Sequence, residues 1–265
     1  MKKFIILILV ALLIFLSFVI TRFKKPDIAI ITDQISTPTI ATEVEMTQIP
    51  SLKLTPSVST RGGTKISWII VRDLKKIVLI PNFEEKATSN EAKNANSCIN
   101  IISGGFYKEG DVPIGLFISE SKLLNAAEEN DTFNGFFSIT MDDVSDISYT
   151  SPTSAKIALQ SGPIVYFNSK PVNLSLVRDE PARRIILALN HVGQVIFVVF
   201  YERNSTTLGP KLSEVPKMLE DLDKSTNLDF EKAINLDGGA HSAFISDTEN
   251  LTEISSSGSF FCIKP

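Results

Sequence analysis

Apolar residues are distributed along the chain in three different ways. Residues 4–20 form one nearly continuous apolar run, which only Ser17 interrupts. Residues 26–60 contain no apolar run long enough to pack, and Ser, Thr and Pro are frequent there. Residues 61–265 carry many short apolar runs that end at glycine or polar turn residues. This distribution predicts a membrane segment, a linker and one folded domain.

The first segment, residues 1–25, has the composition of a membrane anchor. An apolar run of about 17–25 residues can span a bilayer as a helix. No small-residue cleavage pattern follows the run, which favours an uncleaved signal anchor over a cleaved secretory signal. Basic residues flank both ends, so the orientation depends on residues 26–60, which are typical of an extracytoplasmic stalk. We therefore expect a single-pass cell-membrane protein with an extracytoplasmic domain.

Strands are the main element expected in the domain, residues 61–265. Residues 65–71 and 76–81 are expected to pair as a hairpin around Arg72–Lys75. Residues 184–190 and 194–202 are two strongly apolar strands around a second turn. Further strands are expected at 97–102, 116–119, 133–140, 232–236, 243–246 and 259–263, and two more at 156–167 around Ser161–Pro163.

Residues 213–224 have the periodicity of a helix. Ser213 is the candidate N-cap, and Pro216 lies in the first turn, where the missing N–H of proline is tolerated. Residues 84–96 are expected to be either a helix or a loop. Many strands with one or two helices predict an α+β fold with mixed, mainly antiparallel sheets. The apolar positions Val215, Met218, Leu219 and Leu222 share one helical face.

Charge and cysteine content exclude several function classes. The net charge is -4, and no basic block lies beyond the anchor, which argues against a nucleic-acid partner. The chain has two histidines, two cysteines and no C-x-x-C motif, so neither a metal site nor a cofactor is expected. Cys98 and Cys262 form a disulfide in an exported chain or remain two buried thiols, and the sequence leaves both possibilities open.

The stretch NLDGGAHSAF, residues 235–244, combines an acid, two glycines and a histidine within an apolar run. Asp-Gly between apolar runs is a strong hairpin signal. The alternative is a site in which Gly238 and Gly239 N–H groups hold an anion, while Asp237 and His241 act as acid or base. We expect both, namely a turn between two strands and part of the floor of a binding pocket.

Three other glycine-containing loops follow apolar strands, at residues 103–107, 160–163 and 191–193. Adjacent residues of a strand face opposite sides, so at most one of Arg183 and Arg184 points into a shared site. His191 lies in the expected hairpin turn between residues 190 and 194, and we interpret it as structural.

Read in order, six segments match a family pattern across about residues 65–263. They are Val71–Leu74, Ser103–Tyr107, Pro113–Leu116, Gln160–Pro163, Pro181–Arg184 and Asn235–Ser242. The chain resembles the phosphodiester glycosidase family, whose fold and activity it is therefore expected to share. The departures are Ser103 for an asparagine, Arg184 for a threonine, and Ala240 and His241 for a glycine and a serine.

The resemblance implies cleavage of a sugar-1-phosphodiester at its C1–O bond. Arg183 is then the expected phosphate ligand, because a guanidinium matches phosphate oxygens. Asp237 is expected to steady the oxocarbenium-like centre or to activate water, with Asp111 or Glu109 as a second carboxylate. The expected substrate-binding residues are Gly104, Gly105, Phe106, Gln160, Ser161, Gly162, Gly238, Gly239, His241 and Ser242.

Two other functions compete with this one. A non-catalytic protein that binds an envelope glycan or sugar phosphate fits the changes at Ser103 and His241 and the stalk. A serine hydrolase would use Ser242 or Ser161 with His241 and Asp237. It is disfavoured because the chain has no G-x-S-x-G elbow and because three of these residues crowd one short segment.

Overall fold

The computed structural model describes residues 58–61, 63–108, 110 and 112–265. The expected anchor, nearly all of the expected linker, Glu109 and Asp111 lie outside the described residues. The first strand, β1 (Val58–Arg61), begins just before the expected domain boundary at residue 61. Among the described residues, no helix is both long and apolar enough to cross a membrane.

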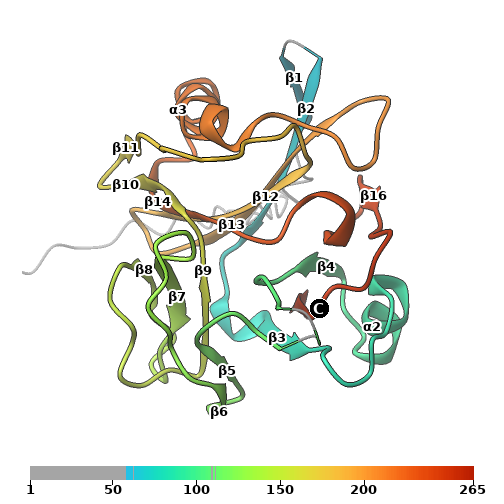
Figure 1. The fold of residues 1–265 in the computed structure, drawn as a ribbon, viewed down its shortest axis with the longest axis vertical. Coiled ribbons are helices and arrows are strands. Elements are labelled where there is room, and N and C mark those ends of the chain that lie inside the picture. Colours follow the sequence, from blue (N-terminus) through green and yellow to red (C-terminus); the bar gives the residue numbers. More distant parts are fainter. Residues whose placement is uncertain (1–57, 62, 109, 111) are drawn as a thin grey trace, which may run out of the picture. The chain divides into compact units, whose positions relative to one another are not determined.

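Three sheets form the domain (Figure 1). Within the described residues their strands pair antiparallel, in line with the mainly antiparallel sheets that the sequence predicts. The first sheet has the order β1, β2 (Thr64–Val71), β13 (Val195–Glu202), β12 (Arg184–Asn190), β14 (Phe230–Asn235), β10 (Ile164–Phe167) and β11 (Lys170–Pro171). The second has the order β16 (Asn250–Leu251), β15 (Phe244–Ile245), β4 (Asn100–Ser103), β17 (Ser259–Ile263) and β3 (Ile77–Pro81). The third has the order β6 (Lys122–Asn125), β5 (Phe117–Ser119), β9 (Ile157–Ser161), β7 (Gly135–Ile139) and β8 (Ser145–Ser148).

Strands β12 and β13 pair as the predicted hairpin and are buried on both faces. Ile185 and Leu187 point into the main core, which all three sheets share. Ile186 and Ala188 point to the other face, against the helix α3 (Val215–Thr226). Burial on both faces explains why these strands are continuously apolar rather than alternating.

The predicted helix forms as α3, with Pro216 in its first turn. The expected Ser213 cap is wrong, because Ser213 lies in a preceding 3-10 turn, η2 (Leu212–Glu214). The Asp179 carboxylate accepts the backbone N–H groups of Leu212 and Ser213 instead, at 2.7 and 3.0 Å. Asp179 lies 33 residues before Leu212, so a local sequence pattern cannot predict its capping role.

The second helix and the disulfide stabilise the second sheet. The helix α2 (Ser89–Ala95) forms within the polar segment that the sequence left as helix or loop. The Thr88 hydroxyl and Glu91 carboxylate make a capping box at its start. Cys98 and Cys262 form a disulfide, which settles the open alternative and ties the residues before β4 to the neighbouring strand β17.

The hairpin predicted around Arg72–Lys75 is wrong. Strands β2 and β3 belong to different sheets, and the 3-10 turn η1 (Leu74–Lys76) carries the chain between them. The Asp73 carboxylate accepts the Lys75 N–H at this turn. The hairpin turn predicted after Asn235 is also wrong. Strands β14 and β15 belong to different sheets, and the 3-10 turn η3 (Gly239–His241) lies between them.

Candidate functional site

The loops that follow β4, β9 and β14 meet the entry to β12 at one junction of the sheets. The Asp237 N–H donates to the Gly104 carbonyl at 3.1 Å, and the Gly162 N–H donates to the Asn235 carbonyl at 3.0 Å. The Gly239 N–H donates to the Arg183 carbonyl at 2.8 Å. Three of the four predicted glycine loops therefore converge. The fourth, residues 191–193, lies at the opposite end of β12.

Close packing at this junction requires glycine at two positions. A Cβ atom on Gly238 would lie 2.5 Å from the Arg183 carbonyl oxygen, and one on Gly104 would overlap the Ser259 hydroxyl. Gly238 therefore lets its loop approach the backbone that enters β12, and Gly104 leaves room for the Ser259 side chain of the neighbouring strand β17. Of the two N–H groups expected to hold an anion, that of Gly239 is committed to the Arg183 carbonyl. The Gly238 N–H acts on the Asp237 carboxyl, where it lowers the pKa.

Asp237 is a half-buried carboxyl at the centre of the junction. Burial raises its pKa from the usual 3.8 to about 7, against the opposing effects of His241 and the Gly238 N–H. Burial also raises the pKa of Tyr107. The Ser259 hydroxyl acts in the opposite direction, and the nearby Asp237 charge raises this pKa further. Asp237 therefore exchanges its proton near neutral pH, as a general acid or base requires.

Arg183 lies beneath the η3 loop rather than at its surface, and it is fully buried. Its Nε donates to the Ser242 hydroxyl at 2.8 Å. Its Nη2 donates to the carbonyls of Gly239, Ser242 and Thr252. Burial lowers its pKa to about 10, although the Glu253 and Tyr201 charges act in the opposite direction. Most of this guanidinium thus holds the loop, and only Nη1 has no partner among the described residues.

Arg184 points to the opposite side of the strand, as the alternation predicts. Its guanidinium donates to the carbonyls of Glu180 and Pro210, at 2.5 and 3.2 Å. It also makes a 3.7 Å ion pair with Asp179, the acid that caps the start of η2. The two neighbouring arginines therefore organise two different segments around the junction.

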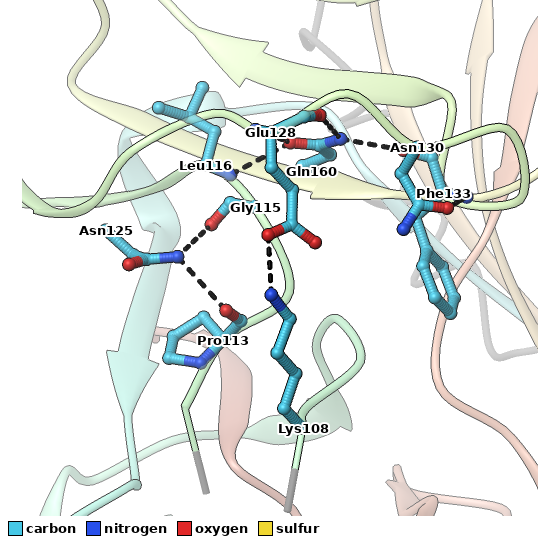
Figure 2. Close-up of polar contacts among 9 residues, drawn as sticks. All are labelled: Lys108, Pro113, Gly115, Leu116, Asn125, Glu128, Asn130, Phe133 and Gln160. Atoms are coloured by element: carbon cyan, nitrogen blue, oxygen red, sulfur yellow. Dashed lines mark hydrogen bonds and ion pairs between the residues drawn. The ribbon is translucent and has the colours of Figure 1, made fainter.

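Gln160 stabilises the protein rather than reaching toward a ligand (Figure 2). Its Oε1 accepts the N–H groups of Leu116 and Glu128, both at 3.1 Å. Its Nε2 donates to the carbonyls of Glu128 and Phe133, at 2.7 and 2.9 Å. All four hydrogen-bonding positions of this side chain are therefore used.

Ser161 is committed in the same way. Its buried hydroxyl donates to the Asn235 carbonyl at 2.7 Å. Ser242 is also buried, and its hydroxyl donates to the Gly239 carbonyl at 2.8 Å while it accepts from Arg183. Neither hydroxyl has a histidine as a hydrogen-bond partner among the described residues, which removes the geometric basis for the serine hydrolase.

A cavity of about 330 Å³ opens beside the junction. Its apolar wall includes Phe106, whose ring lies 4.7 Å from that of Phe133. Asn235 also lines it, and its buried Oδ1 lacks a partner among the described residues. Asn235 belongs to the NLDGGAHSAF stretch, but no site role was expected of it from the sequence. Its position two residues before Asp237 on an extended segment was the available signal. Further lining residues are Gly162, Pro163, Arg178, Glu180, Ala182 and Arg184.

Residues 96–259 match the sequence profile of the phosphodiester glycosidase family. The chain belongs to the phosphodiester glycosidase family. A comparison with curated proteins finds no sequence match.

Two solved structures show the same fold. One is the catalytic domain of zebrafish N-acetylglucosamine-1-phosphodiester alpha-N-acetylglucosaminidase, auto-inhibited by its pro-peptide. It is 15% identical with a TM-score of 0.60, over 80% of this chain and 82% of that one. The other is a hypothetical protein from Synechocystis, 11% identical with a TM-score of 0.57, over 78% of this chain and 61% of that one. The predicted α+β fold is thereby confirmed.

Two departures from the pattern of the phosphodiester glycosidase family have different surroundings. Ser103 is fully buried, and its hydroxyl bonds to the backbone of Ala243, so it joins β4 to the site loop. His241 is exposed, with its Nδ1 3.2 Å from the Ser256 carbonyl oxygen. Ser103 therefore has a structural role in the fold, whereas His241 places an imidazole at the surface of the junction.

Proposed function

We propose that this chain is a membrane-anchored, extracytoplasmic glycosidase that hydrolyses the C1–O bond of a sugar-1-phosphodiester. Membership of the phosphodiester glycosidase family supports this class of substrate. The name of the zebrafish protein with the same fold specifies N-acetylglucosamine. An N-acetylglucosamine-1-phosphodiester is therefore the first substrate to test.

The location is supported by three features of the chain. The apolar run at residues 4–20 suits an anchor, and residues 26–60 suit a stalk. The Cys98–Cys262 disulfide suits an oxidising compartment, since cytosolic proteins keep their thiols reduced.

The observation that carries the proposed chemistry is the Asp237 carboxyl at the junction of the loops. A general base works best when its pKa lies near the working pH, and burial raises this pKa to about 7. Asp237 takes a proton from water as the water oxygen bonds to C1. The bond between C1 and the phosphate oxygen breaks, its electron pair stays on that oxygen, and a phosphomonoester leaves.

The cavity beside the junction suits the substrate. The half-buried Phe106 offers a ring face or edge to a sugar, and the unpartnered Asn235 Oδ1 can accept a hydroxyl or amide N–H. The exposed Arg178 at its rim offers a positive charge. Phe106 and Asn235 support binding of one sugar unit next to the junction, while the Arg178 charge is accompanied in the lining by the carboxylates of Asp179 and Glu180.

The test uses the full-length chain in mild detergent with an N-acetylglucosamine-1-phosphodiester in heavy-oxygen water. We expect the heavy oxygen in the released sugar, because C1–O cleavage adds the water oxygen to C1. Asp237→Asn is expected to lower the rate by about 10³-fold, as for loss of a general base. The matched control, Asp229→Asn, changes an exposed aspartate at the far end of β12 and is expected to keep the rate within twofold. Heavy oxygen in the phosphate would refute C1–O cleavage.

Binding without turnover is the second candidate function. The observation for it is that Gln160, Ser161 and Arg183, three expected ligand contacts, are committed to internal hydrogen bonds. A protein that binds an envelope glycan or sugar phosphate needs no general base. Calorimetry that detects binding of the substrate, with no product formed after prolonged incubation, would favour this function over hydrolysis.

A further inference from the structure

The η3 loop presents His241 at the surface of the junction, held in a defined place. Its Nδ1 lies 3.2 Å from the Ser256 carbonyl oxygen, so Nδ1–H donates there and Nε2 is left for another partner. The N–H groups of Ile254 and Ser255 donate to the Ala240 carbonyl, at 2.7 and 3.1 Å. Residues 254–256 therefore hold both the loop and the imidazole.

When it is protonated, His241 is the cation that acts on Asp237 within the described part of the chain. Its charge favours the ionised form of that carboxyl, and no other cation has a resolved influence on it there. The other charged or titratable groups around this loop are Arg183, Glu253 and Tyr107. Arg183 is buried and turned toward carbonyl groups of the loop, and Glu253 acts on Arg183. Tyr107 lies on the Asp237 side of the junction.

We propose that His241 is a second catalytic residue, whose imidazolium contacts and protonates the leaving phosphate while Asp237 accepts the proton of the attacking water. This inference rests on the proposed function. In the step, the C1–O bond to phosphate breaks and its electron pair stays on the phosphate oxygen. The His241 Nε2 proton moves to the phosphomonoester, and the water proton moves to Asp237. Proton exchange between the two residues through solvent restores the starting state.

Two arguments favour His241 over Arg183 as the residue that contacts and protonates the leaving phosphate. The Arg183 guanidinium was the expected phosphate ligand, but its Nε and Nη2 are occupied beneath the loop. A phosphomonoester takes up a proton with a pKa of about 6, close to that of an ordinary imidazole. The family pattern has a serine where this chain has His241, so the second acid is a property of this chain.

The kinetic test compares His241→Gln, His241→Lys and the control His191→Gln in the full-length chain. We expect His241→Gln to lower kcat by about 10²-fold with a small change in KM. Its pH profile should lose the alkaline limb and keep the rise governed by Asp237. That rise should move to higher pH, because the His241 charge no longer favours the carboxylate. His241→Lys should restore part of kcat and show no alkaline fall in the neutral range, because lysine stays charged. His191→Gln should match the native chain.

A second measurement separates this inference from the proposed function. The chain has two histidines, so the Hε1 protons of their rings give two NMR signals that the variants assign. We expect methyl phosphate to move the His241 signal and leave the His191 signal in place, with chloride at equal ionic strength moving neither. Native protein that turns over no sugar phosphodiester refutes the proposed function, while the response to methyl phosphate still decides whether His241 contacts phosphate. The inference is overturned if methyl phosphate leaves the His241 signal unmoved, or if His241→Gln keeps the native kcat and pH profile.

Discussion

Strand β12 has an aspartate and a histidine near each of its two ends, in different surroundings. At the Asn190 end, His191 Nδ1 lies 3.0 Å from an Asp229 carboxylate oxygen, and its Nε2 lies 3.0 Å from the Ser169 hydroxyl. At the Arg184 end, Asp237 and His241 lie on the loop that joins two sheets. The first group has the connectivity of a hydrolase triad, and the second does not.

Solvent exposure distinguishes the two ends. The side chains of His191 and Asp229 are 47% and 65% exposed, so water screens their interaction. The pKa of His191 is raised, first by its bond to the Asp229 backbone carbonyl and further by the carboxylate. At the other end, burial moves the pKa of Asp237 to about 7. Three side chains in hydrogen-bonding order are thus a weaker sign of chemistry than one half-buried carboxyl whose pKa the fold has raised.

The largest effect on stability is expected from Arg183 at the buried end. Arg183→Met leaves the carbonyls of Gly239, Ser242 and Thr252 without their shared donor. We expect the free energy of unfolding to fall by about 3–5 kcal/mol, as when a buried charge network loses one partner. Chemical denaturation followed by circular dichroism measures this. Arg184→Met, on the other face of the strand, is expected to cost about 1 kcal/mol. Equal losses in the two variants would show that burial of Arg183 is not what matters.

The next largest effect is a pH-dependent loss of folding stability caused by Asp237. Its pKa is 3.8 in the unfolded chain and about 7 in the folded protein, so the folded state holds the proton more tightly. Between these values the unfolded chain has released its proton and the folded protein has not. Stability therefore falls as pH rises from about 4 to 7, by about 1.4 kcal/mol per unit at most.

Replacing Asp237 with asparagine should remove this fall. We expect Asp237→Asn to be more stable than the native protein at pH 8, by on the order of 2 kcal/mol, and the gain to shrink toward pH 4. Denaturation of both proteins across this range gives the difference, in which the other titrating groups cancel. A gain that is the same at every pH would mean that the carboxyl is not responsible.

The smallest effects are expected at the exposed end. A fluorophosphonate probe should leave Ser169 unlabelled, because an exposed hydroxyl beside an exposed histidine gains little nucleophilicity without a buried aspartate and an oxyanion hole. Mass spectrometry of the treated chain checks this directly. Labelling of Ser169 that disappears in His191→Gln would reverse the comparison and make this end a hydrolase site.

Much of the fold follows from the sequence because single strands and α3 leave a local apolar pattern. The sheet that each strand joins does not, since β2 and β3, or β14 and β15, are close in sequence but pair with distant strands. The hairpins expected at those places were wrong for this reason. Turn residues mark where a strand ends, whereas the partner is chosen by the packing of the whole core.

The sequence predicted where the candidate site lies, but not the role of each residue in it. The gathering of three loops follows from glycine motifs at strand ends, and those loops meet at one junction. Whether a polar side chain binds a ligand or a backbone group cannot be seen in a motif. Gln160 and Arg183 satisfy buried carbonyl or N–H groups, which every fold must pair. The raised pKa of Asp237 depends on burial by segments far away in sequence.

The position of β17 has a consequence for biosynthesis. This strand is the last in sequence, yet it lies inside the second sheet, between β4 and β3. Among the described residues, β3 pairs only with β17 in that sheet. Residues 77–81 therefore cannot form their strand pairing until residues 259–263 have been synthesised. A ribosome adds about 5–20 residues per second, so this early strand stays unpaired for roughly ten seconds or more. During that interval, an exposed apolar edge is a binding site for a chaperone and a target for proteases.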